Sequence, residues 1–177
     1  MSARTLVVVR HAKAGHAPGL PDGERPLTPG GERDARAAGE EIRRIVPGLT
    51  TGLTTGRTTG RTAGLTSGPT SGLVLCSPSV RTRRTAELLG LDAPLEIERD
   101  IYEAYPDDLL GVLRRTDGEI GSVVLVGHNP GVHELVAALT GTRLDGFPPG
   151  AYAVIELDVP WEDVAPGTGR LVHVSRT

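Results

Sequence analysis

The sequence predicts an α/β fold, a three-layer α/β/α sandwich with a mostly parallel central sheet. Short apolar runs rich in Val, Ile and Leu alternate along the chain with amphipathic stretches of helical length. Two of the runs, 5–9 and 122–127, each contain four consecutive apolar residues, which indicates strands covered on both faces. A chain of 177 residues can bury a sizeable core, so we expect one domain over residues 1–177.

The other elements follow in order. A loop rich in Gly and Pro covers residues 12–27, and Thr28 followed by Pro29 predicts the start of a helix that ends near Val46. We expect further helices at 80 to about 90, 107–115 and 130–139. We expect further strands at 73–76, 94–98 and 151–157, and an edge strand at 171–174.

Residues 47–72 interrupt this alternation with a repeat of period four that is rich in Gly and Thr and has no aromatic residue. Such a segment buries too little apolar surface to offset the entropy lost on ordering. The cost of closing a loop grows slowly with its length, so a fold can tolerate an insertion of this kind. We therefore expect a low-complexity insertion at about 47–72 that leaves the single domain as a surface excursion.

Composition excludes several classes of protein. The net charge of −3 and the pI of about 5.9 argue against a nucleic-acid-binding protein that relies on a general basic field. Cys76 is the only cysteine, so there is no intrachain disulfide framework, and a reducing compartment is expected. The first apolar run is too short for a signal peptide, and no run is long enough to span a membrane. We expect a cytoplasmic protein that binds neither nucleic acid nor membranes.

Polar residues follow two of the predicted buried strands directly. Arg10 and His11 end the first strand, and His128 ends the strand at 122–127. Ligands of open α/β sheets bind at the carboxyl ends of the strands, so the two histidines can converge on one site. After the second strand, Asn129 is the expected N-cap of the next helix, with Pro130 at its first position.

Three other chemistries were weighed against these residues. The only lysine is Lys13, which does not stand in a P-loop motif. Four residues separate Cys76 from Arg81, one fewer than in the cysteine phosphatase loop, so Cys76 is expected to be an unreactive buried thiol. His128 and His133 are five residues apart and do not share one helical face as zinc ligands four residues apart would, so no metal site is expected.

Four motifs in this order resemble the histidine phosphatase superfamily, and the short chain resembles its small phosphohistidine phosphatase (SixA-like) branch. The resemblance covers nearly the whole chain outside the repeat. The motifs are Leu6-Val-Val-Val-Arg10-His11, Arg25-Pro-Leu-Thr-Pro-Gly30, Ser77-Pro-x-x-Arg81-x-x-x-Thr85-Ala86 and Val126-Gly127-His128-Asn129-Pro130.

The resemblance implies a catalytic role for several residues. His11 would be the nucleophile that is phosphorylated, and water would then hydrolyse the phosphohistidine. Arg10, Arg81 and His128 would be the donors around a phosphoryl group whose charge is spread over three oxygens.

Other residues are expected in supporting roles. Arg25 is carried as a substrate contact or, equally, as a surface charge, and Asn129 and Ser77 are also carried as substrate-binding residues. Glu103 lies in the region that holds the general acid of larger superfamily members, and a solvated surface carboxylate is the alternative.

The sequence therefore predicts a phosphatase that needs no metal or cofactor and acts on phosphohistidine of a protein. A phosphomonoesterase for small phosphorylated metabolites and a module that binds a phosphorylated partner without turnover are the alternatives. The sequence does not identify the physiological substrate, the oligomeric state or the role of the repeat.

Overall fold

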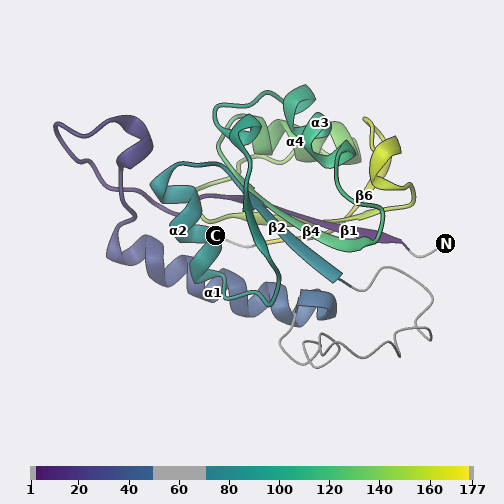
Figure 1. Ribbon diagram of the computed structural model, residues 1–177, viewed down its shortest axis with the longest axis horizontal. Coiled ribbons are helices and arrows are strands. Elements are labelled where there is room, and N and C mark those ends of the chain that lie inside the picture. The colour runs from purple at the N-terminus through teal and green to yellow at the C-terminus, as the bar shows by residue number, and fades with distance from the viewer. Residues whose placement is uncertain (1–2, 50–70, 176–177) are drawn as a thin grey trace.

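The computed structural model describes residues 3–49 and 71–175, which form a six-stranded sheet between two pairs of helices (Figure 1). The strand order is β3-β2-β4-β1-β5-β6. The strands are β1 (Arg4–Arg10), β2 (Ser71–Cys76), β3 (Leu95–Ile97), β4 (Ile120–Gly127), β5 (Tyr152–Leu157) and β6 (Gly169–Val174). The helices are α1 (Pro29–Ile45), α2 (Val80–Leu88), α3 (Pro106–Arg114) and α4 (Gly131–Thr140).

The sheet is mostly parallel, as the sequence predicts. β1, β2, β3 and β4 pair in parallel, whereas β5 runs antiparallel to β1 and to β6. β6 lies at the edge of the sheet, where the sequence places it. The three-layer α/β/α sandwich is therefore confirmed.

The side chains of β1 are buried alternately on the two faces of the sheet. Leu6 and Val8 pack in the core beneath α3 and α4, while Val7 and Val9 pack in the core beneath α1 and α2. All four side chains are fully buried. Successive side chains of a strand point to opposite faces, so an uninterrupted apolar run fits only a strand with a helical layer on each side.

The helix after β4 differs from the prediction. α4 begins at Gly131, with Pro130 as its N-cap residue and no side-chain cap, so the assignment of Asn129 as N-cap and of Pro130 as first helical residue is wrong. The Asn129 side chain instead donates from Nδ2 to the Phe147 carbonyl at 2.8 Å. That amide is engaged with the loop before β5 and does not cap the helix.

Residues 50–70 of the expected repeat insertion lie outside the described residues. The ends of the repeat are structured, which the sequence did not predict: residues 47–49 form a 3₁₀ turn, and β2 begins at Ser71. Leu49 is fully buried in the core beneath α1 and α2. A Cβ atom on Gly72 would lie 2.6 Å from Leu49 Cδ2, so a larger residue there would have to shift the end of the Leu49 side chain.

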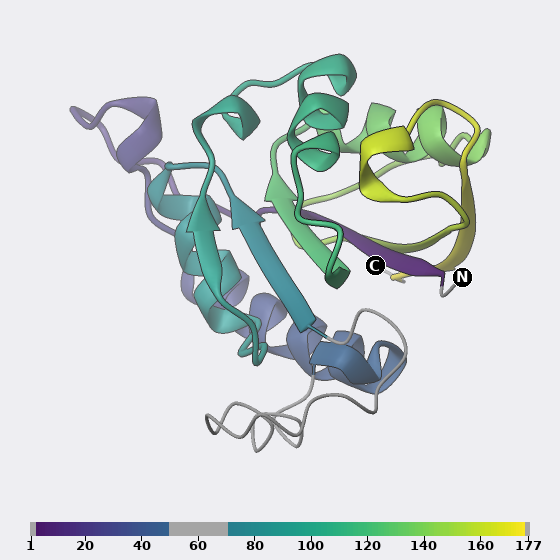
Figure 2. The ribbon, with the colours of Figure 1, turned by 45° about the vertical axis from the view of Figure 1, so that its right-hand side comes forward.

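The segment between β1 and α1 folds as a hairpin, Ala14–Leu27, that projects from the body in both views (Figure 1, Figure 2). Its base is closed by an antiparallel bridge between Ala14 and Leu27. Near its tip lies a short 3₁₀ helix, η1 (Asp22–Glu24). At its base, a Cβ atom on Gly31 of α1 would lie 2.3 Å from the Lys13 carbonyl oxygen, so glycine lets the hairpin start against α1.

Candidate active site

The pairing of β1 with β4 brings the two predicted strand-end histidines together. Arg10 is opposite Gly127 in the parallel register, and the His11 amide donates to the Gly127 carbonyl at 3.0 Å. The ring centroids of His11 and His128 are 5.4 Å apart, and each residue is only 8% exposed.

The His11 ring is held in one tautomer. Its Nδ1 lies 2.8 Å from the Ala12 carbonyl oxygen, which can only accept, so Nδ1 carries the proton and Nε2 has a free lone pair. The Ala12 amide in turn donates to Thr85 Oγ1 of α2 at 3.0 Å, which holds the backbone at Ala12 in place. Burial lowers the pKa of His11 to about 4, against the raising effect of the Ala12 hydrogen bond, and the charges of Arg81 and Arg10 lower it further. His11 is therefore neutral at pH 7.

The His128 ring has two partners of different kinds. Arg81 Nη2 donates to Nδ1 at 3.3 Å, which assigns the ring proton to Nε2, and Nε2 lies 2.7 Å from Ser77 Oγ. Burial is the largest cause that lowers the pKa of His128 to about 3, followed by the neighbouring His11. The Tyr102 ring stands edge-on to His128 at a centroid distance of 5.2 Å.

The hydroxyl of Ser77 lies behind His128 and is fully buried. It is within hydrogen-bond distance of Thr82 Oγ1 and Ser79 Oγ, at 2.7 Å and 3.3 Å. Ser79 is also the N-cap of α2 and accepts a hydrogen bond from the Thr82 amide. The structure thus places Ser77 where it positions the His128 ring.

Arg81 reaches the site from the first turn of α2 and is 5% exposed. Its two terminal nitrogens both donate to Asp22 of η1: Nη1 to the carbonyl oxygen at 2.7 Å and Nη2 to Oδ2 at 2.9 Å. Arg25 Nε and the Tyr102 hydroxyl also donate to the Asp22 carboxylate, at 3.2 Å and 2.8 Å. The hydrogen bond from Tyr102, followed by that from Arg81, lowers the pKa of Asp22 to about 2.

Arg10 approaches from the other side, where Nη1 donates to the Phe147 carbonyl at 3.1 Å. In the part of the chain that the structure describes, five buried side-chain atoms lack a hydrogen-bond partner, and three of them are Arg10 Nε, Arg81 Nε and Asn129 Oδ1. Buried polar groups are usually satisfied, so this concentration of unpaired atoms marks a place prepared for a polar ligand. Two of the three are guanidinium donors, which favours an anion.

The structure leaves Glu103 outside the group of contacting site residues and adds Asp22 and Tyr102 to it. Glu103 is exposed and has a φ of 51°, and the carboxylate that the structure brings to the site is that of Asp22. Sequence reasoning missed Asp22 and Tyr102. No local pattern distinguishes Asp22 from Glu24 in the same short helix, because the contact with Arg81 joins residues 59 positions apart.

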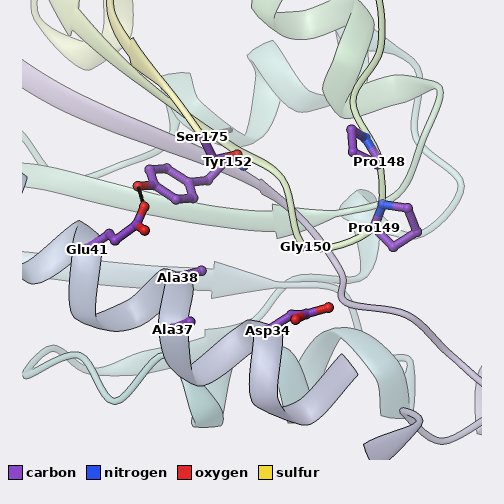
Figure 3. A pocket seen from close by; sticks show the side chains of 9 residues that line it. All are labelled: Asp34, Ala37, Ala38, Glu41, Pro148, Pro149, Gly150, Tyr152 and Ser175. Atoms are coloured by element: carbon purple, nitrogen blue, oxygen red, sulfur yellow. Dashed lines mark hydrogen bonds between the residues drawn. The ribbon is translucent and has the colours of Figure 1, made fainter. Parts of the chain in front are cut away.

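A separate pocket of about 410 Å³ lies between α1 and the start of β5 (Figure 3). Asp34 and Glu41 line it together with Tyr152, whose hydroxyl donates to Glu41 Oε2 at 2.6 Å. None of the predicted site residues lines this pocket, and its carboxylates would repel a phosphate group.

The described residues form neither a metal-binding cluster nor a membrane-spanning helix. Residues 3–49 and 71–175 contain no group of three or more His, Cys, Asp and Glu side chains arranged to hold a metal ion. No helix within these ranges is both long and apolar enough to cross a bilayer. Cys76 is buried at the end of β2, and burial raises the pKa of its thiol to about 11, so it is a poor nucleophile.

Comparisons with known proteins concern the chain as a whole. No protein-family model matches the chain. The uncharacterised protein Rv1276c of Mycobacterium tuberculosis is 30% identical over 180 residues, which cover 95% of this chain and 100% of that protein. The structure of a candidate phosphohistidine phosphatase SixA from Nakamurella multipartitia is 28% identical, with a TM-score of 0.82, and covers 99% of this chain and 97% of its own.

A mycobacterial glucosyl-3-phosphoglycerate phosphatase, Rv2419c, shares the fold at 17% identity and a TM-score of 0.59, over 96% of this chain and 97% of its own. The likeness to the SixA structure and the paired strand-end histidines define the class: the chain has the fold of the histidine phosphatase superfamily and is a phosphatase of the hydrolase class. Within that superfamily its fold is SixA-like.

Proposed function

We propose that this protein dephosphorylates phosphohistidine on a protein, through a phosphorylated His11. The observation that carries the proposal is the His11 ring, which is buried and neutral and donates from Nδ1 to the Ala12 carbonyl. Its free Nε2 lone pair is a competent nucleophile at neutral pH. Arg10 and Arg81 supply guanidinium donors for the phosphoryl oxygens, and His128 would join them by turning its Nε2 proton away from Ser77.

In the first step, His11 Nε2 attacks phosphorus, and the bond from phosphorus to the leaving nitrogen of the substrate breaks with its electron pair on that nitrogen. The substrate ring is protonated on its other nitrogen, so it leaves as neutral imidazole. His11 keeps its Nδ1 proton, so the phosphorylated ring carries a positive charge that the Ala12 carbonyl stabilises. The charge on the three phosphoryl oxygens is balanced by the guanidinium groups of Arg10 and Arg81.

In the second step, water attacks phosphorus on the side opposite Nε2, and the bond from Nε2 to phosphorus breaks. The electron pair returns to Nε2, the water proton leaves with phosphate or to solvent, and neutral His11 is restored. The charged ring is a good leaving group, so neither step uses a metal or a cofactor.

The choice of phosphohistidine rests on the acid that the leaving group requires. An alkoxide leaving from a sugar or glycerol phosphate depends on a general acid, which contributes roughly 10² to 10⁴ in rate. The Asp22 carboxyl has a pKa of about 2 and is ionised at neutral pH, and Glu103 is exposed. An imidazole leaving group needs far less help, so this arrangement favours phosphohistidine over alkyl phosphates.

A phosphomonoesterase for small metabolites is the second candidate. The fold shared with the glucosyl-3-phosphoglycerate phosphatase favours it, because that protein carries its activity on the same scaffold. A phosphomonoesterase would need a general acid to protonate the alkoxide leaving group. Asp22 or Glu103 would have to move to supply that acid.

The test is to trap the phosphorylated enzyme. Rapid quenching with a ³²P-phosphohistidine protein as substrate is expected to give label that is acid-labile, base-stable and mapped to His11. His11→Ala is expected to abolish both label and turnover, while Glu162→Ala, a change at an exposed residue of the 3₁₀ helix Trp161–Asp163, should keep both. Label on Cys76 or Ser77 would contradict the mechanism. Turnover of glycerol phosphate that is faster than that of the phosphohistidine protein would favour the second candidate.

A further inference from the structure

Asp22 occupies the terminal nitrogens of Arg81, which are the donors suited to an anion. Its Nη1 and Nη2 both donate to Asp22, one to the main-chain oxygen and one to the carboxylate, and Nη2 also contacts His128. The only side-chain nitrogen of Arg81 without a partner is Nε. Asp22 thus takes the fork of donors that a phosphoryl group on the way to His11 would use.

Asp22 reaches this place on a segment with room to move. Arg81 is 6% exposed at its side chain, but the Asp22 side chain is 50% exposed. The hairpin that carries Asp22 is closed at its base, where the Gly15 amide donates to the Pro26 carbonyl at 2.9 Å, and its tip projects from the body (Figure 2). Releasing Asp22 therefore exposes one carboxylate and need not open the core.

A phosphoryl group and the Asp22 carboxylate cannot both use Arg81 without cost. Each carries negative charge, and both require donors of Arg81, of which the Asp22 carboxylate holds Nη2 and the Asp22 main-chain carbonyl holds Nη1. If Asp22 stayed in place beside the bound phosphoryl group, like charges would lie next to each other in a partly buried site. Binding of phosphate thus includes the loss of the hydrogen bonds that Asp22 makes with Arg81 and Tyr102.

We propose that Asp22 is a specificity-determining residue that competes with phosphate ligands for Arg81. Inorganic phosphate and small phosphate esters have to displace it unaided. A phosphorylated protein also meets the Ala14–Leu27 hairpin that carries Asp22 and exposes the apolar side chain of Leu20, and contacts there offset the displacement. This inference rests on the proposed function, in which Arg81 holds the phosphoryl group.

The first experiment measures binding of inorganic phosphate to the full chain by calorimetry at pH 7. Asp22→Asn and Asp22→Ala are expected to bind phosphate about tenfold more tightly than wild type, a difference of about 1.4 kcal/mol. Glu24→Gln is the matched control, because it removes the same charge from the same 3₁₀ helix at an exposed position. It is expected to change the affinity less than threefold.

The outcomes separate this inference from the proposed function. Unchanged or weaker phosphate binding in both Asp22 variants overturns the competition between Asp22 and phosphate. Equal tightening in Glu24→Gln overturns it too, because the loss of one negative charge would then explain the change in affinity. Arg81→Ala tests the anion site itself: if it binds phosphate as wild type does, the proposed function fails. Thermal unfolding of each variant verifies that it is folded.

The second experiment tests selectivity in a His11→Ala background, where substrates bind without turnover. Adding Asp22→Asn is expected to tighten the binding of phenyl phosphate by about tenfold and that of a phosphohistidine protein by less than threefold. An equal gain for both ligands would show that the hairpin does not distinguish them, and would overturn the selectivity.

Discussion

Lowering the pH from 7 to 5 is expected to destabilise the protein through its two site histidines. Burial lowers the pKa of His11 to about 4 and that of His128 to about 3, while both lie near 6.5 in an unfolded chain. Below pH 6.5 the unfolded chain therefore binds more protons than the folded one, and the free energy of unfolding falls until the folded pKa values are reached. Between pH 7 and pH 5 the loss is about 2 kcal/mol per histidine.

The assay is urea unfolding followed by the fluorescence of Trp161, the only tryptophan, which is 1% exposed when folded. Wild type should lose about 4 kcal/mol between pH 7 and pH 5. The lowered pKa of Asp22 does not interfere, since its stabilisation is lost only as the pH falls from about 3.8 toward 2.

Variants identify the groups responsible. His11→Gln and His128→Gln should each halve the loss, and His16→Gln should show the wild-type loss because its side chain is exposed. A wild-type loss below about 1 kcal/mol, or the same loss in all three variants, would refute the argument that buried neutral histidines form the site.

Four further predictions concern the site, the core and the repeat. Arg10→Ala and Arg81→Ala should each lower kcat/KM by roughly 10² to 10³, as removal of one oxyanion donor does, and an effect below tenfold in steady-state assays would place the arginine outside the phosphate site. Glu103→Gln should change turnover of a phosphohistidine protein less than twofold, whereas efficient wild-type cleavage of glycerol phosphate that collapses in this variant would overturn the substrate assignment. Leu49→Ala should lower the free energy of unfolding by about 2 to 5 kcal/mol, measured by urea unfolding. A short Gly-Ser linker in place of residues 50–70 should leave activity within a few-fold and Tm unchanged or raised. A loss of folding in the linker variant would contradict the expected surface excursion.

Much of the fold could be predicted from the sequence because the signals are local. The buried run 6–9 predicts a strand with cover on both faces, and the structure divides its side chains between two core layers. Thr28 caps α1 by accepting from the Gly31 amide, as the pair Thr28-Pro29 predicts. Asn129 is not the cap because its side chain is turned toward the Phe147 carbonyl, to which Nδ2 donates, and its Oδ1 accepts from no helix amide. Phe147 is 18 positions away, a separation that no local pattern contains.

The sequence by itself determined that Arg10, His11 and His128 follow strands, which is enough to bring them to one edge of a parallel sheet. Only the tertiary structure decided the protonation and the hydrogen-bond partners of the site residues. The tautomer of His11 depends on the carbonyl of Ala12, a residue whose amide is held by α2, and the contacts of Arg81 depend on a hairpin residue 59 positions away. Strand and helix propensities act over neighbouring residues, whereas hydrogen bonds, burial and pKa depend on groups that meet only after the chain has folded.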